Sequence, residues 1–151
     1  MNLLLIGVGG ALGAIARYLV GGFVQTRTGG PFPWGTLVVN VGGCLVMGAL
    51  AGLAEARGLM TPAARAFLVV GGLGGFTTFS AFGNETVGLL LDRDLMRALA
   101  NVGLSVVLGV TAVWCGRALA ILAAGGRGCR QSCWRSPPAA RSSPWGCSRS
   151  C

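Results

Sequence analysis

The stretch GGLGGFTTFSAFGNE, residues 71–85, lies in the middle of a long apolar run. Four glycines in five positions, followed by two threonines, disfavour a helix interior, because Gly costs roughly 1 kcal/mol relative to Ala. In hydrocarbon, backbone that leaves the helix is tolerated only where protein buries it or a watery cavity solvates it. Interrupted membrane helices commonly present carbonyls to cations and amides to anions. The stretch therefore predicts an ion site, and close helix packing through the glycines is the alternative.

The composition around this stretch is that of a membrane protein, with 53% hydrophobic residues, 11% charged residues and a mean hydropathy of +0.70. At about 20 residues per span, a chain of 151 residues has room for four spanning helices. Four apolar segments can be placed at Leu3 to about Val24, Pro33–Leu53, Ala63–Leu91 and Leu95–Ala124. We predict an all-α membrane protein whose third segment is interrupted near residues 71–78.

The first apolar segment and the C-terminal tail each allow more than one interpretation. The first apolar segment is expected to be a retained helix rather than a signal peptide, because no Lys or Arg precedes it and it continues past the small residues at 14–16. From Arg127 onward the chain is rich in Arg, Ser, Pro and Cys and has no acidic residue. We expect a four-helix membrane domain over residues 1–126 and a disordered tail over residues 127–151.

The tail carries most of the excess charge. It holds five arginines, and without them the formal net charge falls from +8 to +3, so nucleic-acid binding is a weak interpretation. Its cysteines are spaced C-x3-C rather than C-x2-C, and the chain has no His, so a zinc site is not expected. The abrupt change of composition is compatible with a divergent or out-of-frame terminus.

Polar residues inside apolar spans are costly and are therefore functional candidates. Asn40 lies in the middle of the second segment, and Asn101 and Ser105 share one face of the fourth. For each of them, a hydrogen bond between helices is the competing interpretation. Arg17 lies on a small-residue stripe of the first segment, where it either reaches toward an interface or attracts an anion into a vestibule.

Two aromatic residues follow the glycine-threonine stretch. Phe79 and Phe82 are three positions apart and lie on one helical face. Such residues usually face lipid or the core, but the positive edge of an aromatic ring can also contact a small anion. Glu85 continues near that face. Without His or Lys, the chain offers little for a proton relay.

Together these residues resemble the Fluc/CrcB family of small membrane fluoride channels. The resemblance covers about residues 3–124, and its most specific part is GGFTTFS with the upstream GTL-x-x-N. The matching pieces are GGALGAIARY (residues 9–18), PWGTLVVNVGGCLVMG (33–48), GGLGGFTTFSAF with Glu85 (71–85) and NVGLSVVLG (101–109).

The resemblance implies an antiparallel, dual-topology homodimer in a prokaryotic inner or plasma membrane, with two fluoride pathways and no enzymatic activity. It places the carbonyls of a central structural Na+ at Gly74 and Thr77. It places the fluoride pathway at Asn40, Phe79, Phe82, Ser80, Ser105 and Glu85. One departure is Ala81, where members of the family often have Thr, so a hydroxyl along the ion path is missing here.

Flow through such a pore is expected to be passive, because the chain has no nucleotide motif and no relay, and its expected role is export of cytoplasmic fluoride. A multidrug-type proton-coupled antiporter is one alternative, but it needs an acid in the first helix, which here carries Arg17 and no acid. A non-transporting assembly subunit is another, and it would explain the glycines but not the polar residues.

The charge distribution bears on orientation. Arg57 and Arg65 lie on the side of the second connector, and Arg27, Arg93 and Arg97 lie on the other. A balance of two against three lets a chain insert in both orientations, as an antiparallel dimer requires. The tail arginines add to the side of the carboxyl end and would favour a cytoplasmic terminus.

Overall fold

The computed structural model describes residues 2–57 and 60–124, and the secondary-structure elements in this part of the chain are all helices. The tail predicted over residues 127–151 lies outside the described residues. The elements in chain order are α1 (Asn2–Thr28), α2 (Trp34–Arg57), α3 (Pro62–Ala64), the π-helix η1 (Arg65–Leu73), α4 (Gly74–Phe76), α5 (Phe79–Leu91) and α6 (Leu95–Ala123).

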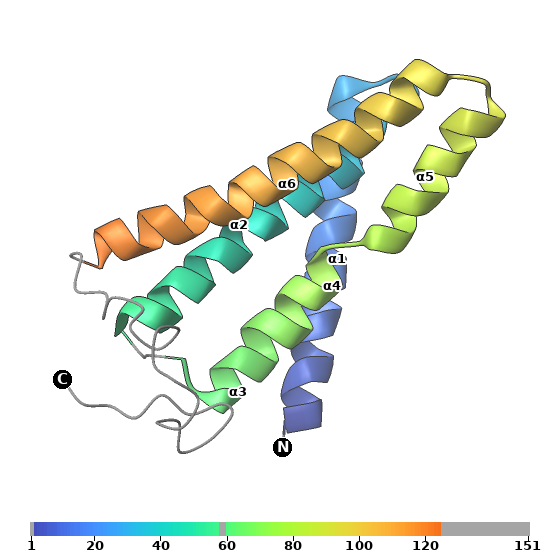
Figure 1. The fold of residues 1–151 in the computed structure, drawn as a ribbon. Helices are drawn as coiled ribbons and strands as arrows, with labels where there is room; N and C mark the ends of the chain where they lie inside the picture. The colour runs from blue at the N-terminus through green and yellow to red at the C-terminus, as the bar shows by residue number, and fades with distance from the viewer. Residues whose placement is uncertain (1, 58–59, 125–151) are drawn as a thin grey trace, which may run out of the picture.

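Four helical stretches are long and apolar enough to cross a membrane, namely α1, α2, the run from α3 to α5, and α6. The prediction of an all-α chain with four spans is therefore confirmed. Figure 1 shows α2 and α6 running side by side, with α1 next to the run from α3 to α4.

The first two helices extend beyond the predicted segments. α1 continues to Thr28 and α2 to Arg57, so Glu55 lies in α2 rather than in a connector. The predicted segments are shorter because hydropathy identifies only the apolar part of a helix. The polar last turns of α1 and α2 continue beyond that part. Glu55 has a partner on another helix, since its Oε2 lies 2.7 Å from Nη2 of Arg117 in α6.

The side chain of Gln25 forms hydrogen bonds across the connection between α1 and α2. Gly29 and Gly30 have positive φ values of 64° and 75°, which glycine adopts without strain. Gln25 donates from Nε2 to the carbonyl of Phe32 (3.1 Å) and accepts from the N–H of Gly35 (3.1 Å). The side chain thus ties the end of α1 to the start of α2.

Glycines allow the helices to approach at backbone distance. A Cβ placed on Gly9 or Gly13 of α1 would collide with backbone atoms of η1 or α4, including the carbonyl oxygens of Phe67 and Gly72. The same holds between α2 and α6, where Gly48 lies against the backbone of Val113. Small residues have this role in membrane helix pairs, because apolar side chains gain nothing by leaving lipid.

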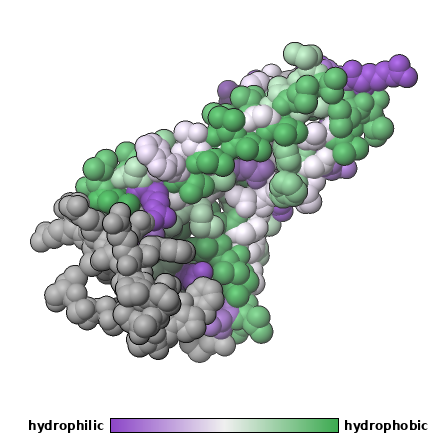
Figure 2. All heavy atoms as spheres, viewed as in Figure 1, coloured by the Kyte–Doolittle hydropathy of each residue, from purple (hydrophilic) through white to green (hydrophobic). Residues whose placement is uncertain are grey.

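The surface is apolar, as a membrane-spanning chain requires. Figure 2 shows apolar side chains over much of the visible face. Large apolar residues are highly exposed, for example Leu3 at 84% and Trp114 at 71%. In water, patches of this size would mark a contact surface, whereas here they face lipid or further protein.

The third span departs from helical geometry at two residues, which we call the extended pair. Thr77 has φ −80° and ψ 155°, and Thr78 has φ −149° and ψ 116°. Thr78 caps α5, since its Oγ1 accepts from the N–H of Ala81 at 3.2 Å. Past this point α5 has few neighbours, because it packs only lightly on α6 and α2.

The backbone contact between α1 and η1 predicts the effect of a single methyl group. Gly13→Ala should destabilise the fold by about 1–3 kcal/mol, because neither backbone can yield without moving a helix. Gly7→Ala is the matched control, since nothing lies within 4 Å of its Cβ position. Thermal aggregation of the detergent-extracted protein, followed by size-exclusion chromatography, measures the difference. Equal midpoints for the two variants would contradict the predicted packing.

Candidate functional site

The extended pair is held by a side chain from another span. Asn40 of α2 donates from Nδ2 to the carbonyl of Thr78 (3.0 Å) and accepts from the N–H of Thr78 at Oδ1 (2.8 Å). The N–H of Thr78 is thereby satisfied at a point where the helix cannot provide its acceptor, and the carbonyl of Thr78 gains a donor from outside the span. A primary amide has two N–H donors, so one N–H of Asn40 remains beyond this pair of bonds.

These bonds leave specific carbonyls without their usual helical partners. In a continuous helix the N–H of Thr78 would bond to the carbonyl of Gly74, four residues earlier, but here it bonds to Asn40. Likewise the N–H of Ala81 bonds to Thr78 Oγ1 and is not available to the carbonyl of Thr77. The two carbonyls predicted to bind a cation are thus among those that lose their helical donors at the interruption.

No acidic cluster competes for this role in residues 2–57 and 60–124. Within these ranges, no three His, Cys, Asp or Glu side chains converge in a way that could hold a metal. A cation at the extended pair would therefore rely on backbone oxygens. Such oxygens are ligands that hard cations accept, so the residues present fit the Na+ predicted from the sequence.

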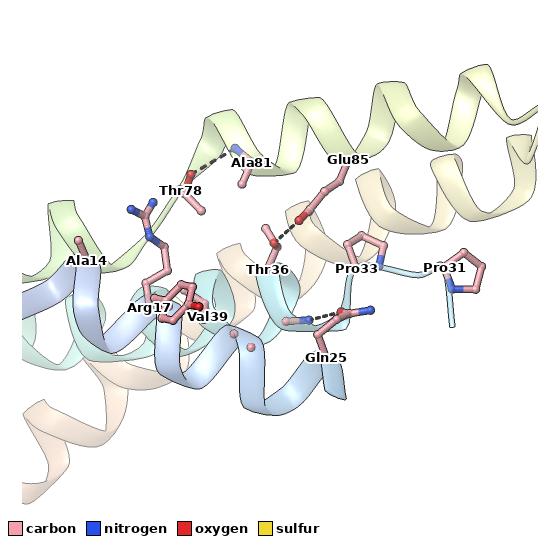
Figure 3. A pocket seen from close by; sticks show the side chains of 14 residues that line it. Ala14, Arg17, Gln25, Pro31, Pro33, Thr36, Val39, Thr78, Ala81 and Glu85 are labelled. Carbon is pink, nitrogen blue, oxygen red and sulfur yellow. Dashed lines mark hydrogen bonds between the residues drawn. The ribbon is translucent and has the colours of Figure 1, made fainter. Parts of the chain in front are cut away.

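One cavity of about 550 Å³ lies between α1, α2 and α5. Its walls include Arg17, Thr36, Thr78 and Glu85 (Figure 3). Ala81 also lines it, so the hydroxyl that the sequence lacks would have projected from this wall. The cavity reaches Gln25 and the prolines of the connection between α1 and α2.

The two charged residues of this cavity have different partners. Glu85 accepts a hydrogen bond at Oε1 from the hydroxyl of Thr36 (2.6 Å), while its Oε2 is buried without a partner. Arg17 forms neither of the two ion pairs found among the described residues, which are Arg97–Asp94 and Arg117–Glu55. In Figure 3 its guanidinium points from α1 toward the start of α5. A free cation in a polar recess is suited to attracting an anion.

A second cavity of about 380 Å³ lies on the other side of the extended pair. It is lined by Asn40, Thr77, Phe79, Phe82 and Ser105, among others. The rings of Phe79 and Phe82 lie 5.4 Å apart with planes tilted by 43°, and Phe79 is 83% exposed. This cavity presents an amide, hydroxyls and aromatic edges together.

The structure divides the predicted residues between the two cavities. Asn40, Phe79, Phe82 and Ser105 line the second, Arg17 and Glu85 line the first, and Thr78 lines both. Ser80 lines neither, but its Oγ lies 3.2 Å from Oγ1 of Thr78. Gly74 and Thr77 line the second cavity, next to the freed carbonyls.

Sequence reasoning missed Thr78 and Thr86 as individual residues. Thr78 could have been found, because a threonine before an apolar run is a typical helix N-cap. Thr86 accepts a hydrogen bond from Asn101, and no local pattern indicates it. Asn101 itself is buried against α5 and lines neither cavity, although it shares a helical face with Ser105.

Comparison with known proteins identifies the family. A family model described as "CrcB-like protein, Camphor Resistance (CrcB)" matches residues 4–117. The chain belongs to the CrcB family. The match spans all the residues that line the two cavities, from Ala14 to Val113.

Curated CrcB relatives share this extent. A protein of Methylocella silvestris named "Fluoride-specific ion channel FluC" is 45% identical over 123 residues, covering 80% of this chain and 94% of the relative. Proteins with the same name from Rhizobium meliloti and Opitutus terrae are 47% and 48% identical, over 78% of this chain and 94% and 91% of the relatives.

The two bonds between Asn40 and Thr78 predict a stability effect in this CrcB-family chain. Asn40→Leu keeps the number of side-chain heavy atoms but leaves the half-buried N–H of Thr78 unpaired and takes one donor from its carbonyl, at a total cost of about 1–3 kcal/mol. Asn84→Leu, at an exposed position of α5, is the matched control. Thermal unfolding in detergent should show a large loss for the first variant and little change for the second. A loss no larger than that of the control would show that other groups satisfy Thr78.

Proposed function

We propose that this chain is a passive, fluoride-selective channel that carries cytoplasmic fluoride out of the cell. The observation that carries the proposal is the spare N–H of Asn40, which the bonds to Thr78 hold in the lining of the second cavity, next to the residue that lines both cavities. The names of its CrcB relatives support fluoride as the ion.

Fluoride holds its water tightly, so a pore must replace that water with donors in sequence. Arg17 supplies a cation in the first cavity, and Asn40 and Ser105 supply an N–H and a hydroxyl in the second. The ring edges of Phe79 and Phe82 carry partial positive charge and contact the ion without binding it strongly. Ser80 and Glu85 complete the polar groups beside this route.

The working unit we propose is an antiparallel dimer of dual-topology chains in the inner or plasma membrane of a prokaryote. Phe79 and the second cavity are open in the single chain, and a second copy would enclose them. The near balance of arginines on the two sides supports insertion in both orientations. Each dimer would hold two pathways.

A structural Na+ at the centre of this dimer is part of the proposal. Carbonyls of Gly74 and Thr77 from both chains would provide four oxygen ligands on the two-fold axis. The support is that the helical donors of both carbonyls are diverted to side chains. Bound only by the assembled pair, such an ion stabilises the dimer by mass action.

Two other functions compete with a channel. A multidrug-type proton-coupled antiporter would have the same four helices, but α1 carries Arg17 and no acid. An assembly subunit without transport would need the glycine contacts but not a spare amide N–H in the lining of a cavity. Liposomes loaded with fluoride, chloride or a lipophilic cation separate the three, because a channel of the proposed kind releases only fluoride.

The pathway assignment predicts two losses of transport. Asn40→Asp should nearly abolish fluoride efflux from liposomes, because it places a negative charge beside the anion path and removes the N–H. Phe82→Ile should slow efflux while the dimer stays assembled, and Phe23→Ile on exposed α1 surface should not. Full efflux from a folded Asn40→Asp protein would refute the assignment.

The sodium site predicts an effect on assembly alone. In the single chain, the nearest atom to a Cβ on Gly74 is the carbonyl oxygen of Val69 at 3.9 Å, so Gly74→Val fits within one protomer. We expect this variant to lose the dimer, while Thr77→Ser keeps it, because the ligand is a backbone carbonyl. Chemical cross-linking in sodium and in a sodium-free buffer measures the dimer fraction. A Gly74→Val dimer as abundant as the parent's in sodium would exclude the site.

A further inference from the structure

α5 carries both aromatic rings of the second cavity, yet this second half of the third span packs only lightly on α6 and α2. In Figure 1 it lies along the outer edge of the molecule. Two consecutive residues tie it to different helices. Glu85 accepts from Thr36 of α2 (2.6 Å), and Thr86 accepts from Asn101 of α6 (2.9 Å). Consecutive residues point about 100° apart around a helix, so the two bonds hold α5 from two directions.

In the hydrogen bond between Asn101 and Thr86, only Asn101 can be the donor. Thr86 donates its single hydroxyl proton to the carbonyl of Phe82 at 2.7 Å, so it can only accept from Asn101. The amide of Asn101 therefore connects, through one hydroxyl, to the backbone of the residue whose ring lines the second cavity.

Asn101 is an expensive residue at its position. It is 1% exposed and is the one buried polar residue of the described ranges. Burying an amide has a cost that a leucine would not have. What the amide adds is direction, because a hydrogen bond fixes the rotation of a lightly packed helix and an apolar contact does not.

We propose that Asn101 and Thr86 are positioning residues that fix the rotation of α5, and thereby the placement of Phe79 and Phe82, without contacting the ion. Neither residue lines either cavity. The proposal rests on the proposed channel function for its effect on transport, and on the hydrogen bonds alone for its effect on α5.

The experiment is a double-mutant cycle on the full chain in liposomes. Asn101→Leu and Thr86→Val each remove the same bond, so each should slow fluoride efflux about fivefold while the dimer stays assembled. The double variant should be no slower than the slower single variant. Thr86→Ser should stay near the parental rate, because it keeps the hydroxyl. Thr111→Val, which removes an exposed hydroxyl elsewhere on α6, is the matched control.

The ratio of fluoride to chloride release distinguishes a positioning role of Asn101 and Thr86 from a role in stability alone. Misplaced rings should lower the ratio of fluoride to chloride release in both single variants, and Thr86→Ser should restore it. A folded variant that is slower but keeps the parental ratio would overturn the positioning role. A double variant that is slower by the product of the two single effects would overturn it too, because Asn101 would then act independently of Thr86.

Hydrogen exchange of the parent and variants provides a readout that does not depend on transport. Amides of residues 82–90 should exchange faster in Asn101→Leu and Thr86→Val than in the parent or Thr111→Val. Unchanged exchange would refute the tie. If the parent itself releases no fluoride while exchange behaves as expected, the proposed function fails and the tie stands.

Discussion

The rest of the site depends on the pair of hydrogen bonds between the Asn40 amide and the backbone of Thr78. Backbone that leaves a helix inside hydrocarbon is unstable unless each polar group finds a partner, and this amide supplies a donor and an acceptor at once. The carbonyl of Gly74 loses its helical donor to Asn40, and the carbonyl of Thr77 loses its donor to the hydroxyl of Thr78. The interruption and the freed oxygens thus depend on the side chains of Asn40 and Thr78 together, and α5 with its aromatic rings starts from this point.

That arrangement also needs backbones that approach closely. Gly9 and Gly13 bring α1 against η1, and Gly48 brings α2 against α6. These contacts make a rigid frame around the extended pair, whereas α5 is left to a few polar ties. The chain thus combines a tightly packed support with one lightly packed helix, α5, and the aromatic residues are on α5. The positions of the aromatic rings therefore depend on the hydrogen bonds that join α5 to α2 and α6.

Much of this could be predicted from the sequence, for reasons that differ between residues. Hydropathy located four spans because lipid selects apolar side chains along the whole length of a helix. The glycines and threonines of residues 71–85 indicated an interruption because they are poor helix formers. Asn40 stood out because an amide in hydrocarbon needs a partner. The partner itself could not be predicted, since Asn40 and Thr78 are 38 positions apart.

Periodicity likewise placed Asn101 and Ser105 on one face but could not say which neighbour each would meet. The structure puts Asn101 against Thr86 and Ser105 in the second cavity. Glu55 and Arg117, 62 positions apart, form an ion pair for which the sequence has no local pattern. In each case the missing information was the rotation and offset of one helix relative to another.

Thr78 lies in the wall of both cavities, and this has an electrical consequence. One cavity reaches toward the connection between α1 and α2. The other reaches toward Val69 and Val113, which lie in the halves of their spans that are far from that connection. If both are filled with water, they bring the bulk potential of each side to the same residue. The membrane field, worth about 2.3 kcal/mol per charge at 100 mV, is then concentrated near Thr78. An ion would meet much of the driving voltage over a short part of its path.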